Sequence, residues 1–164
     1  MDIATFDALP EPEAERVLLG CCTSSRWARA LAARRPYGSP DALLAAADAA
    51  LADFDDADLD EALAGHPRIG ERSASSASAR EQAAVLSSDE AVLAALAEGN
   101  GRYEQRFGHV YLVCASGRSG AELLAVLTER LANDPATERV RMRAELGKIN
   151  RIRLRQLVTE EECP

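Results

Sequence analysis

The chain has 164 residues, of which 47% are hydrophobic and 28% charged, and this composition suits one soluble globular domain spanning residues 1–164. Its formal net charge of −8 argues against nucleic acid or an anionic membrane as a partner, because both attract clustered positive charge. Only 4% of residues are aromatic, and Ala and Leu dominate the apolar set. We therefore expect an all-α, single-domain bundle of about seven to nine helices with one short extended segment.

The N-terminus and the cysteines predict a soluble, cytoplasmic protein. No charged stretch is followed by an apolar run and a cleavage site, and no segment approaches the ~20 apolar residues of a membrane helix. The four cysteines form no CxxC pair, and no histidine lies at zinc-finger spacing from them. Reduced thiols are the expected state.

Helix starts recur along the chain as a capping residue, followed in two places by proline at the first helical position. Ser39-Pro40 and Asp134-Pro135 are the clearest starts. Ser119 has the same capping chemistry, as does either Asp55 or Asp56 for the helix that follows them. Pro36 and Gly65 mark helix ends. The expected helices cover about residues 12–22, 25–35, 40–51, 56–63, 78–86, 88–107, 121–131 and 135–158.

Two stretches are predicted to lie outside helices. The first is the loop His66-Pro67-Arg68-Ile69-Gly70, which precedes a segment rich in Ser and Ala. The second is Val110–Cys114, which has the β-branched and aromatic composition of a strand. A single strand cannot make a sheet, so we expect it to run as an extended, buried segment between helices.

His66 is the first candidate for chemistry. Pro67 biases it away from helical geometry, so its imidazole can point into a cleft, and histidine suits proton transfer near neutral pH. The alternative is an ordinary surface histidine beside a helix end.

Glu81 is the second candidate, and a structural alternative accompanies it. It follows Ser78 by three residues, the spacing of a capping box in which the glutamate reaches back to the cap backbone. The next residue, Gln82, carries an amide that can both donate to and accept from a ureido group.

Arg153 interrupts an apolar stripe on the last predicted helix. Met142, Leu146, Ile149, Arg153 and Leu157 recur at intervals of four, three, four and four. An inward guanidinium needs an anionic partner from the protein or from a ligand. The alternative places Arg153 at the rim while Ile152 packs inward.

His109 is the second of the two histidines in the chain. Together with His66 it could contribute to a metal site, although the sequence has no H-E-x-x-H motif. The chain also lacks a G-x-S-x-G elbow, a P-loop and a dinucleotide fingerprint, so hydrolase, kinase and dehydrogenase assignments lose their usual support.

Taken in order, the motifs resemble the 2-oxo-4-hydroxy-4-carboxy-5-ureidoimidazoline (OHCU) decarboxylase family. The individual motifs are short, but their order and approximate spacing agree along nearly the whole chain. They are Cys22-x-x-Ser25-x-Trp27 with Arg35-Pro36, HPRIG at 66–70, SAREQ at 78–82, YEQRFGHVYLVCA at 103–115 and ELGKINRIRL at 145–154.

The resemblance implies an all-helical fold that decarboxylates OHCU, a small anionic substrate, to (S)-allantoin in urate catabolism. It implies no cofactor and no metal, and it identifies His66, Glu81 and Arg153 as the catalytic residues. A homodimer is compatible with this assignment. The resemblance also implies substrate contacts from Pro67, Ser78, Ala79, Arg80, Gln82, Tyr111, Leu112, Val113, Cys114 and Ala115, the last five through backbone groups.

Two features depart from the family pattern. The connection from Pro67 to Ser78 is shorter than in many relatives, and His109 stands where many have an aromatic residue. Two other functions stay open, a helical interaction module without catalysis and a metal-dependent ureide amidohydrolase that uses His66 and His109.

Overall fold

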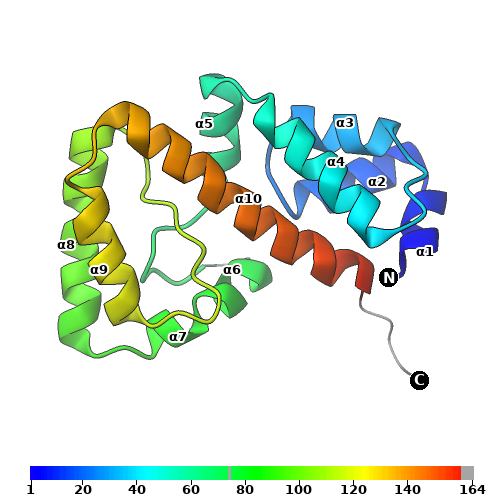
Figure 1. Ribbon diagram of the computed structural model, residues 1–164. Coiled ribbons are helices and arrows are strands. Elements are labelled where there is room, and N and C mark those ends of the chain that lie inside the picture. The colour runs from blue at the N-terminus through cyan, green and yellow to red at the C-terminus, as the bar shows by residue number, and fades with distance from the viewer. Residues whose placement is uncertain (74, 160–164) are drawn as a thin grey trace. The chain divides into compact units, whose positions relative to one another are not determined.

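Ten helices and no strand make up the described part of the computed structural model, residues 1–73 and 75–159 (Figure 1). The all-α prediction is confirmed, with slightly more helices than expected. The helices are α1 (Ile3–Ala8), α2 (Glu11–Leu19), α3 (Ser25–Ala33), α4 (Pro40–Ala52), α5 (Asp56–Ala64), α6 (Ser76–Glu81), α7 (Ala83–Leu86), α8 (Glu90–Phe107), α9 (Gly120–Arg130) and α10 (Pro135–Thr159).

The chain forms two compact units. The first contains Met1–Gly65 and the chain from Gly147 onward, and the second contains His66–Leu146. Helix α10 supplies residues to both, because the boundary falls within it. That both units form one domain stays a prediction. None of the helices in the described ranges is long and apolar enough to span a membrane.

The first unit is built around α3, which contacts both α2 and α4. Trp27 and Leu31 lie one turn apart on α3 and are fully buried, and the indole nitrogen of Trp27 donates to the carbonyl of Ala47 at 3.2 Å. The side chains of Ser39 and Asp55 cap α4 and α5, as predicted. Capping residues and the spacing of apolar residues therefore account for this unit.

The second unit packs α8 against α9 and surrounds one extended segment. This segment, residues 110–115, has no regular secondary structure, and its buried side chains join the core. Ser119 caps α9 in a capping box with Glu122, and α10 begins at Pro135, as predicted. The core consists of Ile69, Val85, Leu96, Tyr103, Tyr111, Val113, Ala115, Leu123 and Leu127.

The predicted start of the helix at Ser78 is wrong. Ser75 caps α6 instead, its hydroxyl accepting from the backbone nitrogen of Ser78, and Ser78 itself is buried inside the helix. The helix ends at Glu81, and Gln82 separates it from α7. The spacing of Ser78 and Glu81 therefore does not reflect a capping box.

Candidate active site

His66 and Pro67 begin the second unit immediately after Gly65 ends α5. Both residues are half-buried and lie in irregular backbone, as the sequence predicted. Glycine is required before them, since a Cβ on Gly65 would lie 2.3 Å from the Cγ2 atom of Thr23. The residue before His66 therefore packs closely against Thr23.

Side chains from elsewhere hold the rest of the HPRIG loop. The Gln82 amide accepts from the backbone nitrogen of Gly70 at 2.8 Å and donates to the carbonyl of Arg68 at 3.3 Å. Asn100 of α8 donates to the carbonyl of Ile69 at 2.8 Å. Three consecutive loop residues are therefore fixed by amides distant in sequence.

Glu81 is the last residue of α6 and is half-buried. Because Gln82 follows it directly, the turn that carries Glu81 is bonded to the loop that carries His66. Ser78 is buried on the same helix, Ala79 is half-buried and Arg80 is exposed. The structure thus brings the HPRIG loop and the SAREQ helix together within one unit.

The engagement of Gln82 changes its expected role. Its oxygen and its nitrogen both bond to the loop backbone, and the side chain is only 4% exposed. These contacts give Gln82 a positioning role in the loop, and its contact to substrate stays a prediction.

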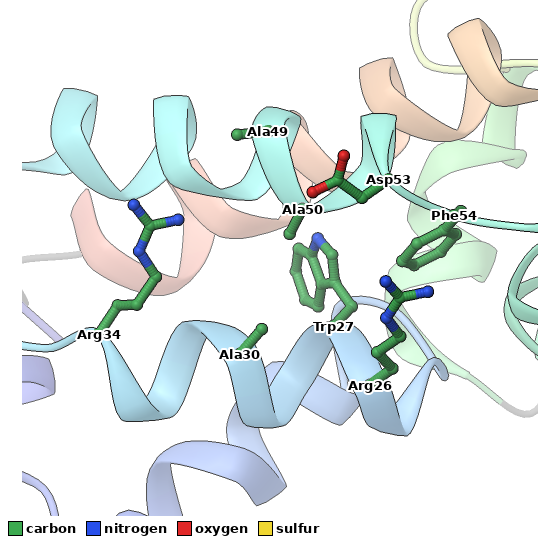
Figure 2. Close-up of a pocket in the computed structure, with 8 residues that line it drawn as sticks. All are labelled: Arg26, Trp27, Ala30, Arg34, Ala49, Ala50, Asp53 and Phe54. Carbon is green, nitrogen blue, oxygen red and sulfur yellow. The ribbon is translucent and has the colours of Figure 1, made fainter.

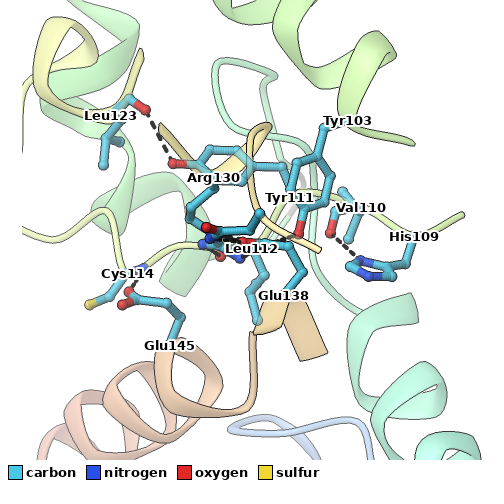
Figure 3. A network of polar contacts seen from close by, with 11 residues as sticks. Tyr103, His109, Val110, Tyr111, Leu112, Cys114, Leu123, Arg130, Glu138 and Glu145 are labelled. Atoms are coloured by element: carbon cyan, nitrogen blue, oxygen red, sulfur yellow. Dashed lines mark hydrogen bonds and ion pairs between the residues drawn. The ribbon is translucent and has the colours of Figure 1, made fainter. Parts of the chain in front are cut away.

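Several backbone groups of the extended segment make protein contacts, among them the carbonyl of Ala115, which accepts from the backbone nitrogen of Arg118 at 3.0 Å, and those drawn in Figure 3. The nitrogen of Cys114 donates to the buried carboxylate of Glu145 at 2.9 Å, and the carbonyl of Leu112 accepts from Arg130 Nη1 at 2.6 Å. The hydroxyl of Tyr111 donates to the carbonyl of Leu123 at 3.1 Å. The expected row of donors and acceptors for a cyclic urea is therefore partly occupied.

A buried ion pair supports this segment. Arg130 and Glu138 are 1% and 0% exposed, and Arg130 Nη2 lies 2.8 Å from Glu138 Oε2. The hydroxyl of Tyr103 and the amide of Asn133 also donate to this carboxylate. The guanidinium carbon of Arg130 lies 5.7 and 5.0 Å from the centroids of the Tyr103 and Tyr111 rings, which contact each other at 5.4 Å. Figure 3 shows the three side chains gathered in one network.

This network governs the ionisation of its members. Burial by itself raises the pKa of Glu138, but hydrogen bonds from Arg130, Tyr103 and Asn133 outweigh it and hold the pKa below the ordinary value. Burial is also the main cause of the raised pKa of Tyr103, and the neighbouring Glu138 raises it further. The carboxylate is therefore charged and the phenol is neutral near pH 7.

Arg153 lies in the first unit and is 8% exposed. Its Nη1 donates to the carbonyl of Cys21 at 3.1 Å, whereas Ile152 is only half-buried. The rim alternative for Arg153 is therefore wrong. Burial raises the pKa of the Cys22 thiol, and the Arg153 guanidinium partly opposes this rise.

His109 belongs to an aromatic cluster in the second unit. Its ring centroid lies 5.5 Å from that of Tyr103 and 6.2 Å from that of Phe107, and its Nδ1 lies 3.2 Å from the carbonyl of Val110. The described residues contain no group of three or more His, Cys, Asp or Glu side chains arranged to hold a metal ion.

Each unit also has a cavity of its own. In the first, about 140 Å³ lies between α3 and α4 beside Trp27, where Ala30, Ala49 and Ala50 leave space between Arg26 and Arg34 (Figure 2). In the second, about 250 Å³ lies between the HPRIG loop and α8. Neither cavity is lined by any of the predicted site residues.

The sequence analysis missed Arg130, Glu138, Glu145 and Asn100. Arg130 had a usable signal, since it follows Leu123 and Leu127 at intervals of four and three, as Arg153 follows its own apolar stripe. Asn100 likewise lies between Leu96 and Tyr103 on one face of α8. A polar residue on an apolar helix face was the sign to follow in both cases.

The family model for OHCU decarboxylase matches residues 7–155. The uric acid degradation bifunctional protein TTL of Arabidopsis thaliana is 33% identical over 149 residues, which are 86% of this chain and 46% of that protein. The 2-oxo-4-hydroxy-4-carboxy-5-ureidoimidazoline decarboxylase of Amia calva is 38% identical over 65 residues, 40% of this chain and 35% of that protein. The matches thus span less than half the length of these curated relatives.

Two solved structures share the fold. A crystal structure of OHCU decarboxylase in the presence of (S)-allantoin is 30% identical, with a TM-score of 0.78, and the match covers 87% of this chain and 96% of that one. A crystal structure of (S)-allantoin synthase is 20% identical, with a TM-score of 0.75 and coverage of 96% and 54%, and it supports the fold alone. Since the family match runs across both compact units, the chain belongs to the OHCU decarboxylase family.

Proposed function

We propose that the chain decarboxylates 2-oxo-4-hydroxy-4-carboxy-5-ureidoimidazoline to (S)-allantoin in the breakdown of urate. The observation that carries the proposal is the Gln82 amide, which joins the loop of His66 to the turn of Glu81. The solved relative determined in the presence of (S)-allantoin supports this product. Family membership over residues 7–155 supports the reaction class.

The substrate can supply its own electron sink. One ring carbon carries the carboxylate and a hydroxyl, and the adjacent carbon forms a C=N bond and carries the ureido group. When the C–CO₂ bond breaks, its electron pair moves towards the C=N nitrogen, which gains a proton. The hydroxyl then loses its proton to give a carbonyl, and the adjacent carbon is protonated on one face. We therefore propose catalysis without a cofactor.

The protein groups divide the remaining tasks. His66 acts as acid and base, Glu81 orients it or binds the ureido group, and Arg153 stabilises negative charge on the substrate. Pro67, Ser78, Ala79 and Arg80 contribute substrate contacts at the loop and helix. The backbone from Tyr111 to Ala115 contributes further contacts. The Leu112 carbonyl, the Cys114 nitrogen and the Ala115 carbonyl already bind Arg130, Glu145 and Arg118, so other groups of the segment serve the substrate.

Location and assembly belong to the same proposal. The described cysteines, Cys21, Cys22 and Cys114, are thiols rather than disulfides, which supports a reducing, cytoplasmic compartment. The substrate is a small anion, and neither nucleic acid nor a membrane is a proposed partner. A homodimer stays a prediction that sedimentation analysis can test.

The decisive experiment generates the unstable substrate from urate in the cuvette and follows allantoin by circular dichroism. Enzymatic decarboxylation produces one enantiomer, whereas spontaneous decay in achiral solution favours neither. His66→Asn should fold normally and lose about a hundredfold or more in turnover, the usual scale for removing a general acid or base. A wild-type chain that leaves the dichroic signal at the spontaneous level would refute the proposed function.

A further inference from the structure

The loop that carries His66 is fastened to α8 at two successive residues. Asn100 donates to the carbonyl of Ile69 at 2.8 Å. Arg68 forms a two-pronged ion pair with Glu104, its Nε lying 2.6 Å from Oε1 and its Nη2 lying 2.8 Å from Oε2. Asn100 and Glu104 are four residues apart, so one face of α8 holds both.

Packing supports this part of the loop unevenly, because Ile69 is buried in the core but a cavity lies beside the loop. The cavity of about 250 Å³ lies between residues 68–71 of the loop and α8, and its α8 side includes Ala97 and Gly101. A Cβ built on Gly101 would meet no heavy atom within 4 Å in the described structure. Where side chains leave such space, polar contacts to α8 add to the anchoring that the buried Ile69 side chain provides.

Asn100 is well suited to this task because it is nearly immobile. The residue is 2% exposed and lies in the middle of an 18-residue helix. Its amide nitrogen reaches the loop, whereas its Oδ1 has no hydrogen-bond partner among the described residues. Burying that oxygen carries a cost, so the contact to Ile69 must offset it.

We infer that α8, through Asn100 and the Arg68–Glu104 pair, positions His66 for proton transfer. This inference rests on the proposed function, in which His66 is the acid and base. Gln82, next to Glu81, forms hydrogen bonds to the loop, and Asn100 of α8 forms another. Asn100 does not need to touch the substrate to affect the rate, since a small displacement of a catalytic group is costly.

The test uses the fact that the chain has only two histidines. Their ring carbon–proton signals can be assigned by NMR with His109→Gln, and the His66 signal then reports the loop directly. Asn100→Leu keeps the number and branching of the side-chain heavy atoms and removes the donor to Ile69. We expect a shifted or broadened His66 signal, and a kcat about tenfold lower with KM changed less than about twofold.

Val92→Ala is the matched control on the same helix. Val92 packs towards Gly120 at the start of α9 and loses only apolar contact in this variant. It should lower stability while leaving the His66 signal and the kcat per folded molecule unchanged.

Arg68→Ala removes the ion pair between the loop and Glu104. Because the Arg68 side chain is half-exposed, this variant can be studied even if Asn100→Leu does not fold. We expect it to move the His66 signal in the same direction and lower kcat about threefold.

The outcomes separate this inference from the proposed function. An unmoved His66 signal in Arg68→Ala and in any folded Asn100 variant would overturn the positioning role. So would a shifted signal with unchanged kcat, or a lower kcat with an unmoved signal. A wild-type chain that produces no excess of one allantoin enantiomer would instead refute the proposed function.

Discussion

Arg130→Met tests the buried network beneath the extended segment. The substitution removes every donor that Arg130 provides to Glu138 and to the carbonyl of Leu112. The carboxylate stays in a site that is 0% exposed, and it keeps only Tyr103 and Asn133 as donors among the contacts described. Breaking a buried pair on one side typically costs about 3–5 kcal/mol, a large share of the ~5–15 kcal/mol that stabilises most domains.

Glu138→Gln tests the same ion pair from the side of the carboxylate. In the wild-type background it removes the charge that Arg130 requires and should destabilise the chain. In the Arg130→Met background it removes an uncompensated charge and should recover about 1–3 kcal/mol. The same substitution is therefore expected to change sign between the two backgrounds.

Urea denaturation followed by far-ultraviolet circular dichroism gives the free energy of unfolding of the wild type, the two single variants and the double variant. A loss below about 1 kcal/mol for Arg130→Met, or the same sign for Glu138→Gln in both backgrounds, would refute the reasoning.

In the wild-type protein the folded pKa of Glu138 lies below its ordinary value of 4.5. Its stabilising contribution is therefore present above pH 4.5 and should decline as the pH falls through the folded pKa.

Three further results are expected. Arg153→Met should change the free energy of unfolding by no more than about 1–2 kcal/mol, because removal of a buried charge offsets the loss of its polar contacts, the donor to Cys21 among them. Turnover should fall about 10- to 1000-fold, and unimpaired turnover in the coupled urate assay would contradict the substrate role. Gly101→Ala should raise the free energy of unfolding by about 1 kcal/mol, because alanine favours the helix and the new methyl meets no atom. Gly99→Ala should lower it, because the new methyl would lie 2.6 Å from Leu127 Cδ2, and equal effects in thermal melts would contradict the packing described. Extensive chelation should leave the rate of allantoin formation intact, and loss of activity restored only by added metal would refute the cofactor-free reaction.

Helix type and most helix boundaries follow from local rules. Ser39, Asp55 and Ser119 cap the helices that their sequence positions predicted, because capping involves residues within one turn. The same rules were insufficient at Ser78. Ser75, Ser76 and Ser78 each offer a capping hydroxyl, and the packing that buries Ser78 leaves Ser75 as the cap.

The candidate site shows the same division. The types and order of His66, Glu81 and Arg153 are visible in the sequence, because a family motif is a linear pattern. Sequence periodicity does not identify which residues pair with each other. Such pairs are Gln82 with Gly70, Asn100 with Ile69 and Arg130 with Glu138. A polar residue on an apolar helix face shows that a buried partner is needed. Only the tertiary structure decides which partner it is, because the candidate donors and acceptors are chemically equivalent until packing brings one of them within about 3 Å.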